Sequence, residues 1–293
     1  MHDLDFTSST EKSEAPASSN FDSAAALDFF RSAGKELNMP AGEIIFTENQ
    51  KSSRLLFQRD KMYLLLDGTV ELAANGNQVD IVQQGEIFGE MAAISQTPRN
   101  ATATTKSQCH LISMDDKQFE NALRDKPEFA LTLMTLMANR LRNMVGLLNT
   151  NNALTPDIAH HDSFALSRNL LANLASELGD SSSMSCEQGK IIMQEGQAGA
   201  LMYIVLEGSV LISIQGTDVE MVGPGGFFGE MALIERTKRM ASATAASDCS
   251  LLAINHNAFI NLVKDNPEFG VAILSAIGER VRLMISHLVN GAA

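Results

Sequence analysis

The stretch FGEMAAISQTPRNAT, residues 88–102, determines how this 293-residue sequence is interpreted, because a near copy, FGEMALIERTKRMAS, occupies residues 228–242. The displacement is 228 − 88 = 140 residues. In each copy a glycine stands between a phenylalanine and a glutamate, and an arginine follows that glutamate by nine positions. The repetition predicts that each half of the chain carries the same packing unit or the same pocket.

The displacement of 140 residues extends far beyond these two stretches. Pairs in this register include Tyr63 and Tyr203, Gly68 and Gly208, Gly85 and Gly225, Pro127-Glu128-Phe129 and Pro267-Glu268-Phe269, and Arg140 and Arg280. A fixed displacement over this length indicates two copies of one domain, and the length of the chain agrees with two domains of about 100 to 150 residues each.

Each copy is strand-like first and helical second. Short β-type runs flank a tight turn at Asn75-Gly76 or Gln215-Gly216, and a longer segment with helical spacing of apolar residues follows. Pro127 and Pro267 divide that segment into a short and a long helix. We therefore predict an α+β chain of two tandem antiparallel β-barrel or jelly-roll domains, each with flanking helices and a long C-terminal helix.

Composition shifts place the expected boundaries. Residues 1–20 are predicted to be a disordered tail, 21–150 the first domain, 151–183 a linker with a helix and a Ser-rich turn, and 184–293 the second domain. The first copy is longer, since Gly42 to Gly68 spans 26 positions and Gly189 to Gly208 spans 19. The extra residues fall near KSSRLLFQRDK, residues 51–61, which we interpret either as a solvated loop or as a basic contact, for an acidic partner or for the chain's own acidic surface.

Charge and composition exclude several classes of protein. A net charge of −13 argues against broad attraction to the phosphate backbone of DNA or to anionic membranes, and no run of about 18 apolar residues suggests insertion into a membrane. The first residues lack the pattern of a signal peptide. Three cysteines without ligand-like spacing are expected to be reduced, so we predict a cytoplasmic protein without a metal site.

The repeated stretch suggests a specific ligand chemistry. A glycine at 89 or 229 lets backbone approach a ligand, and the helix that follows begins with free amide groups that suit an anion. Arg99 or Arg239 supplies a planar fork for phosphate oxygens. A phosphate would repel the glutamate, so the partner of Glu90 or Glu230 must be a neutral donor such as a sugar hydroxyl. Together these groups fit a ribose that carries a compact phosphate.

Both stretches resemble the phosphate-binding cassette of the cyclic-nucleotide-binding domain family, which reads approximately F-G-E, small apolar residues, then P-R-x-A-[TS]. The first copy matches throughout, and the second has Lys238 in place of the proline. The resemblance covers roughly residues 38–148 and 184–289. It implies a β-barrel domain whose last helix acts as a lid or hinge over the bound nucleotide.

The resemblance also implies a role for each matching position. Glu90 and Glu230 would accept the ribose 2′-hydroxyl, and Arg99 and Arg239 would bind the cyclic phosphate. The whole predicted set is Phe88, Gly89, Glu90, Met91, Ala92, Arg99, Asn100 and Ala101 in the first copy, and Phe228, Gly229, Glu230, Met231, Ala232, Arg239, Met240 and Ala241 in the second. The base would lie under Asn143 and Met144 in the first domain, and under Met284 and Ile285 in the second, although these residues also fit ordinary core packing.

Base preference is expected to follow the residue after each arginine. In the family, Thr or Ser at this position favours guanine, but this chain has Asn100 and Met240. Methionine donates no useful hydrogen bond, so the second site is predicted to prefer cAMP. The first site is left open between cAMP and cGMP.

We expect a receptor and no enzyme, because neither copy repeats a nucleophile with an adjacent base. Two tandem copies resemble the regulatory subunit of cAMP-dependent protein kinase, but no Arg-Arg-x-Ser/Ala inhibitor segment precedes the first copy, and a helix-turn-helix DNA-binding domain is not expected after Ala293. The prediction is a cytoplasmic sensor that changes conformation and signals through an unidentified effector protein. The alternative is a scaffold whose cassettes bind no cyclic nucleotide, or a different nucleoside.

Overall fold

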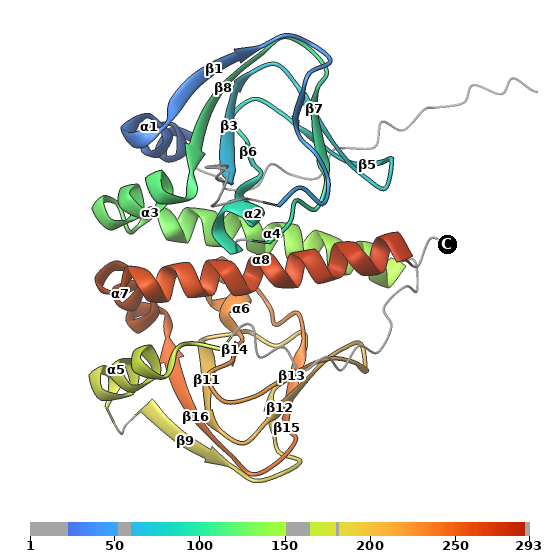
Figure 1. Cartoon of the computed structure of the whole chain (residues 1–293). Coiled ribbons are helices and arrows are strands. Elements are labelled where there is room, and N and C mark those ends of the chain that lie inside the picture. Colours follow the sequence, from blue (N-terminus) through green and yellow to red (C-terminus); the bar gives the residue numbers. More distant parts are fainter. Residues whose placement is uncertain (1–22, 52–59, 96, 151–164, 180–181, 291–293) are drawn as a thin grey trace, which may run out of the picture.

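Two β domains lie on opposite sides of a pair of long helices in the computed structural model (Figure 1). The structure describes residues 23–51, 60–95, 97–150, 165–179 and 182–290. The predicted tail at 1–20 and most of the basic segment at 51–61 lie outside these ranges, as do residues 151–164 of the predicted linker. The architecture confirms the predicted fold class, with tandem β domains each followed by a long helix.

The first domain contains two four-stranded antiparallel sheets among its described residues, in the orders β1-β8-β3-β6 and β2-β7-β4-β5. Its elements are α1 (Ser23–Ala33), β1 (Lys35–Met39), β2 (Ile44–Phe46), β3 (Lys61–Asp67), β4 (Val70–Ala74), β5 (Asn77–Val82), β6 (Ile87–Phe88), α2 (Glu90–Ser95), β7 (Thr102–Thr105), β8 (Cys109–Asp115), α3 (Asp116–Asp125) and α4 (Phe129–Thr150).

The second domain repeats this plan, with described sheets ordered β14-β11-β16-β9 and β10-β15-β12-β13. Its elements are α5 (Arg168–Leu178), β9 (Ser183–Cys186), β10 (Ile191–Met193), β11 (Leu201–Glu207), β12 (Val210–Ile214), β13 (Thr217–Val222), β14 (Phe227–Phe228), α6 (Glu230–Glu235), β15 (Ser242–Ala245), β16 (Cys249–Asn255), α7 (His256–Asp265) and α8 (Pro267–Asn290). Helix α5 packs on this domain, where the Leu166 amide just before it donates to Gly225 O at 2.9 Å.

Local sequence explains how these elements begin and turn. The β4–β5 hairpin turns at Asn75-Gly76 with φ of 49° and 79°, and the β12–β13 hairpin at Gln215-Gly216 with φ of 51° and 80°. Two consecutive left-handed residues give the tight turn whose twist matches antiparallel strands, as predicted. Asp115 starts α3 by accepting a hydrogen bond from the Gln118 amide at 2.8 Å.

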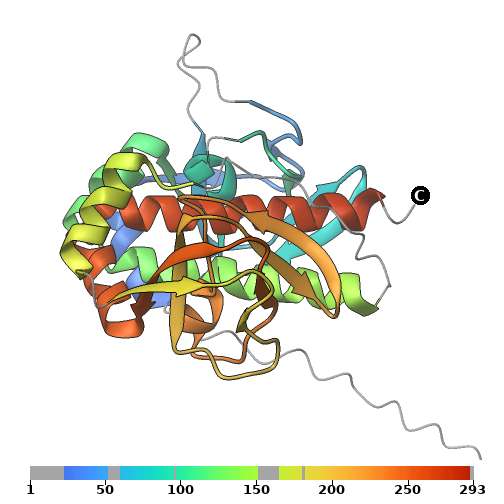
Figure 2. The same ribbon diagram turned by 90° about the horizontal axis from the view of Figure 1, so that it is seen from below.

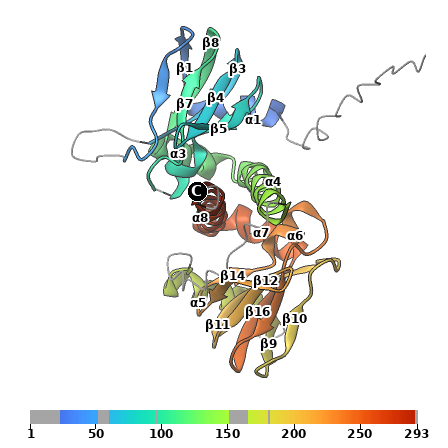
Figure 3. The same ribbon diagram turned by 90° about the vertical axis from the view of Figure 1, so that its right-hand side faces the viewer.

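Helices α4 and α8 pack side by side between the two β domains (Figures 1 and 3). Gly270, near the start of α8, lies against Ala130, near the start of α4, and Gly278 lies against Met137 farther along both helices. The two helices therefore run parallel, and small residues allow their backbones to approach. Figure 2 shows α8 crossing the molecule with the second domain's strands in front. One core cluster includes Leu133 of α4 and Ile277 of α8, so the described domains share apolar packing.

Candidate functional site

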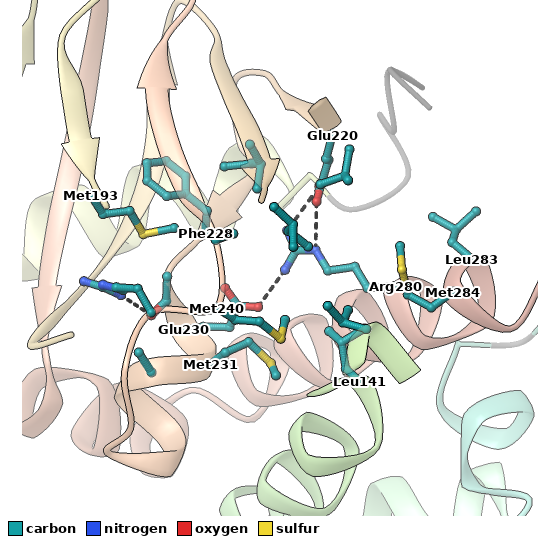
Figure 4. Close-up of a pocket in the computed structure, with 18 residues that line it drawn as sticks. Leu141, Met193, Glu220, Phe228, Glu230, Met231, Met240, Arg280, Leu283 and Met284 are labelled. Atoms are coloured by element: carbon teal, nitrogen blue, oxygen red, sulfur yellow. Dashed lines mark hydrogen bonds and ion pairs between the residues drawn. The ribbon is translucent and has the colours of Figure 1, made fainter. Parts of the chain in front are cut away.

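Each domain has a pocket bounded by its repeated stretch, which we call the first cassette (residues 88–102) and the second cassette (residues 228–242). The first pocket is lined by Phe46, Leu72, Val79, Asp80, Gly89, Glu90, Met91, Ala92, Arg99, Asn100, Ala101, Arg140, Met144 and Val281. The second pocket is lined by Leu141, Val145, Met193, Ile212, Ile214, Val219, Glu220, Phe228, Gly229, Glu230, Met231, Ala232, Arg239, Met240, Ala241, Arg280, Leu283 and Met284 (Figure 4).

Three predicted site residues are not among these lining residues. Phe88 is fully buried in β6, where its ring stacks on Tyr63 with centroids 5.2 Å apart. Asn143 is exposed on α4, because one step along a helix turns a side chain by about 100° away from its neighbour Met144. The side chain of Ile285 lies outside what the structure describes. The other predicted residues line the two pockets.

Both cassette glycines have a backbone conformation that favours glycine, and the arginine beside each one leaves no room for a Cβ atom. Gly89 has φ of 71° and Gly229 has φ of 82°, a left-handed region that other residues rarely adopt. A Cβ on Gly89 would lie 3.0 Å from Arg99 Nη1, and one on Gly229 would lie 2.7 Å from Arg239 Nη1. From the sequence we expected glycine here to let the backbone approach a ligand. In the structure, the space that a Cβ atom would fill is next to the arginine side chain.

The Arg99 side chain is held against the first barrel. Its Nη1 donates to Gly89 O at 2.7 Å and its Nη2 to Lys61 O at 2.8 Å, while Asp60 Oδ1 lies 3.6 Å from Nη2. The guanidinium carbon also lies 4.2 Å from the centroid of the Phe46 ring. Burial lowers the pKa of Arg99, and the Asp60 carboxylate opposes that shift. The buried Nε atom has no hydrogen-bond partner.

Arg239 is held in the same manner but without a carboxylate. Its Nη1 donates to Gly229 O at 2.7 Å and its Nη2 to Leu201 O at 2.5 Å. Ala200 stands where the first domain has Asp60 (60 + 140 = 200), and no ion pair to Arg239 is found within the described part of the chain. Burial lowers the pKa of Arg239 as well. The second cassette arginine therefore keeps more of its charge available for an anion.

Glu90 is 1% exposed and forms an ion pair with Arg140 of α4 through its Oε1 atom. Arg140 also donates to Ile87 O at 2.7 Å. Burial acts to lower the pKa of Arg140, but Glu90 raises it overall. The other carboxylate oxygen, Glu90 Oε2, is buried and has no hydrogen-bond partner. An unpartnered buried acceptor is costly, so this atom favours a ligand that brings a donor.

The second cassette glutamate belongs to a larger charge network (Figure 4). Arg280 of α8 donates to Glu230 Oε1 at 2.7 Å, and its Nε and Nη2 bond the two oxygens of Glu220 at 3.1 and 3.2 Å. Burial raises the pKa of Glu230, which Arg280 opposes, while the two carboxylates raise the pKa of Arg280 despite its burial. The equivalent of Glu220 in the first domain is Asp80 (220 − 140 = 80), which lines the first pocket.

Each pocket is completed by the other domain's long helix. Leu141 and Val145 of α4 line the second pocket, and Val281 of α8 lines the first. These residues reach the opposite pocket because α4 and α8 run parallel and in contact. Neither pocket can be described from one repeat alone.

Sequence reasoning missed several pocket residues. The repeat had paired Arg140 with Arg280 but gave no role to either, although a matched pair of arginines 50 residues after the cassette glutamates was a usable signal. Glu220 of the second pocket carried no comparable signal, and neither did Asp60, which lies beside Arg99 without lining the pocket. The cross-domain residues Leu141, Val145 and Val281 follow only from how the helices pack.

Among the residues that the structure describes, no group of three or more His, Cys, Asp or Glu side chains is arranged to hold a metal ion. None of the helices described combines the length and the apolar character needed to cross a bilayer.

The chain is similar to one family model and to several known proteins. The model of the cyclic nucleotide-binding domain family matches residues 36–126 and 183–266, which together exceed half of the chain. A cAMP-dependent protein kinase regulatory subunit of Yarrowia lipolytica is 26% identical over 246 residues, 83% of this chain and 58% of the relative. The type II regulatory subunit of Drosophila melanogaster is 27% identical over 232 residues, 76% of this chain and 56% of the relative.

A solved structure of the regulatory domain of Toxoplasma gondii PKA with cAMP is also similar, at 23% identity and a TM-score of 0.31 over 82% of this chain and 86% of that one. The chain spans less than two thirds of the length of the two regulatory subunits that it matches. The family match covers both domains and both cassettes. The chain therefore belongs to the cyclic nucleotide-binding domain family.

Proposed function

We propose that the chain is a cyclic-nucleotide receptor with one binding pocket in each domain. The observation that carries this proposal is a matched pair of unpartnered atoms in the first pocket. Glu90 Oε2 is a buried acceptor and Arg99 Nε a buried donor, and both residues line the same pocket. A ribose hydroxyl supplies the missing donor and a cyclic phosphate the missing acceptor.

The same arrangement suggests how the ligand is held. The ribose 2′-hydroxyl donates to the cassette glutamate, and the phosphate accepts from the cassette arginine and from backbone amides around Gly89 and Ala101, or Gly229 and Ala241. Gly229 precedes α6 without a side-chain cap, which leaves amide donors at this end for an anion. At about 0.3 kcal/mol per heavy atom, a nucleotide of this size binds in roughly the micromolar range.

We assign cAMP as the ligand of the second pocket. Its wall near α8 is apolar, with Met240, Leu283 and Met284, and these side chains suit stacking on a base better than reading its edge. Glu220 also lines this pocket, but Arg280 already occupies both of its oxygens. In the first pocket Asn100 adds an amide, so cAMP and cGMP are both assigned to it.

Ligand binding is proposed to shift the position of the long helices. Arg140 joins Glu90 to α4, and Arg280 joins Glu230 to α8, so a hydroxyl that engages either glutamate changes the contact that holds the helix. The ligand shifts this equilibrium by its difference in affinity between the two helix positions. The resulting surface change would be read by an effector protein.

The test compares cAMP with 2′-deoxy-cAMP, by calorimetry, on the wild-type chain and on Glu90→Gln. We expect removal of the 2′-hydroxyl to weaken binding at the first pocket by about tenfold in the wild-type chain and much less in Glu90→Gln. Linear 5′-AMP serves as the control for the cyclic phosphate. Equal affinity for cAMP and 2′-deoxy-cAMP in the wild-type chain would remove Glu90 from ribose recognition.

A second candidate function is a scaffold that binds no cyclic nucleotide. The observation that favours it is that each cassette glutamate already has an arginine partner, so both glutamates also serve packing between barrel and helix. This alternative predicts no binding heat with cAMP or cGMP, whereas the receptor predicts heat with at least one of them.

A further inference from the structure

Three consecutive residues of α4 contact both domains' cassettes. Arg140 bonds Glu90 of the first cassette, Leu141 lines the second pocket, and Arg142 bonds Glu235 of the second cassette. Because these residues lie on one helical turn, a shift of α4 at the first cassette moves the contact to the second. The helix thus forms a direct physical link between the two cassettes.

The contact of Arg142 with the second cassette is built from several hydrogen bonds. Arg142 Nη2 and Nε both donate to Glu235 Oε2, the latter at 3.1 Å, and Nη2 also donates to Thr237 Oγ1 at 2.7 Å. Thr237 in turn donates to Glu235 Oε2 at 3.3 Å. We call Arg142, Glu235 and Thr237 the interdomain clamp.

The clamp holds a buried charge and depends on Arg142. The Glu235 side chain is 4% exposed, and its Oε1 atom has no hydrogen-bond partner. A buried carboxylate that loses its counter-ion is strongly destabilised, so the segment would rearrange without Arg142.

The clamp lies between the two ligand-binding residues of the second cassette. Glu235 is the last residue of α6, which begins at Glu230, and Thr237 stands two positions before Arg239. The intervening Arg236 has φ of 54°, so the chain leaves α6 through a left-handed residue. Fixing Glu235 and Thr237 therefore fixes the spacing between Glu230 and Arg239.

Within the described residues, no equivalent ion pair joins α8 to the first cassette. Arg282 is the repeat mate of Arg142 (282 − 140 = 142), and it bonds Glu279 of its own helix at 2.7 Å. Ser95 stands where the second cassette has Glu235 (235 − 140 = 95), so the first cassette has no carboxylate there. Arg282 is thus a matched control, with the same residue type at the same helical position but outside the clamp.

We propose that Arg142, a residue of the first domain, is a positioning residue of the second nucleotide pocket. It sets the affinity of that pocket by holding Glu235 and Thr237 and so couples the two pockets through α4. The inference rests on the proposed function, since it concerns how the second pocket binds its nucleotide. By linkage, a nucleotide in the second pocket stabilises the same position of α4.

The experiment uses the full chain and reads the second pocket in an Arg99→Ala background. Arg142→Gln and Glu235→Gln are compared with Arg282→Gln by calorimetry with cAMP. We expect Arg142→Gln to weaken cAMP binding by about tenfold. The double variant Arg142→Gln/Glu235→Gln should weaken it little further. The affinity of Arg282→Gln should stay within about twofold of the background. Circular dichroism verifies that each variant is folded.

Hydrogen exchange in the ligand-free chain supplies a readout that needs no nucleotide. We expect faster exchange across residues 228–242 in Arg142→Gln and Glu235→Gln, and unchanged exchange there in Arg282→Gln. Equal affinity and equal exchange for Arg142→Gln and Arg282→Gln would overturn the proposal. If the wild-type chain gives no heat with cAMP, the proposed function fails, and exchange over the second cassette alone decides whether the clamp positions it.

Discussion

In the first domain the cassette arginine has a carboxylate 3.6 Å away, Asp60, whereas in the second domain Ala200 occupies that position. At the cassette glutamates, it is the second domain that has the additional carboxylate. Arg140 pairs with Glu90, while Arg280 is held between Glu230 and Glu220. The additional carboxylate in contact with an arginine therefore lies beside the cassette arginine in the first domain and beside the helix arginine in the second. A sequence repeat of this quality does not guarantee two equivalent binding sites.

The difference assigns distinct properties to the two pockets. Asp60 competes with a phosphate for Arg99, so the first pocket should bind the anion less tightly than the second. Glu220 keeps Arg280 paired when Glu230 engages a ligand, so the second helix contact is better protected. We therefore expect the first pocket to be the more easily switched and the second to bind the nucleotide more tightly.

The largest expected effect is the loss of a cassette arginine. Arg239→Ala should weaken cAMP binding at the second pocket by roughly 100-fold, because the phosphate loses its charge-assisted partner. Calorimetry of this variant should show one remaining site, and Arg99→Ala should show the other. Two unchanged sites in either variant would reject the arginine assignment.

Neutralising the glutamate of each cassette should change the free energy of unfolding by different amounts in the two domains. Glu90→Gln leaves Arg140 without its ion-pair partner and should lower the free energy of unfolding by about 2 kcal/mol. In Glu230→Gln, Arg280 keeps its ion pair with Glu220. Because the pKa of Glu230 is raised, its ionisation opposes folding at neutral pH. We therefore expect the free energy of unfolding to change by no more than about 1 kcal/mol. Urea unfolding of ligand-free protein measures both, and equal losses would refute the contrast.

Exchanging the carboxylate between domains should exchange part of the affinity difference. Asp60→Ala should strengthen phosphate binding at the first pocket by about fivefold, and Ala200→Asp should weaken it at the second by a similar factor. Each variant is measured with cAMP in a chain whose other pocket is disabled by the arginine substitution above. Effects of the same sign in both domains would show that the carboxylate does not act through the arginine.

The smallest expected effect is a pH dependence at the second pocket. Because burial raises the pKa of Glu230, its protonation begins nearer to neutral pH, and a protonated carboxyl loses its ion pair and accepts the ribose hydroxyl less well. Affinity for cAMP in the Arg99→Ala chain should fall by about threefold between pH 7 and pH 5. The decline should vanish when Glu230→Gln is added, and persistence there would assign it to another group.

Much of the fold was predictable because its signals are local. The turns at Asn75-Gly76 and Gln215-Gly216, and the cassette spacing from Glu90 to Arg99, depend on neighbours within a few residues of each other. The 140-residue register then extends each signal to the second domain. Helical phase was harder to predict, since Met144 lines the first pocket while its neighbour Asn143 is exposed.

The remaining pocket residues depend on tertiary packing. Arg140 reaches Glu90 across 50 residues, and Arg142 reaches Glu235 across 93. No local sequence pattern specifies these contacts, because they depend on how α4 and α8 pack between the domains. The matching cassettes also gave no sign of the asymmetry between the pockets, because it arises outside them, at Asp60 and Ala200.

The most direct test of the account is calorimetry of the full chain, freed of co-purified ligand, with cAMP and then cGMP. The account predicts two cAMP molecules bound per chain, with the tighter site removed by Arg239→Ala and the weaker one by Arg99→Ala. No binding heat with either nucleotide would contradict the assignment of both cassettes as cyclic-nucleotide sites.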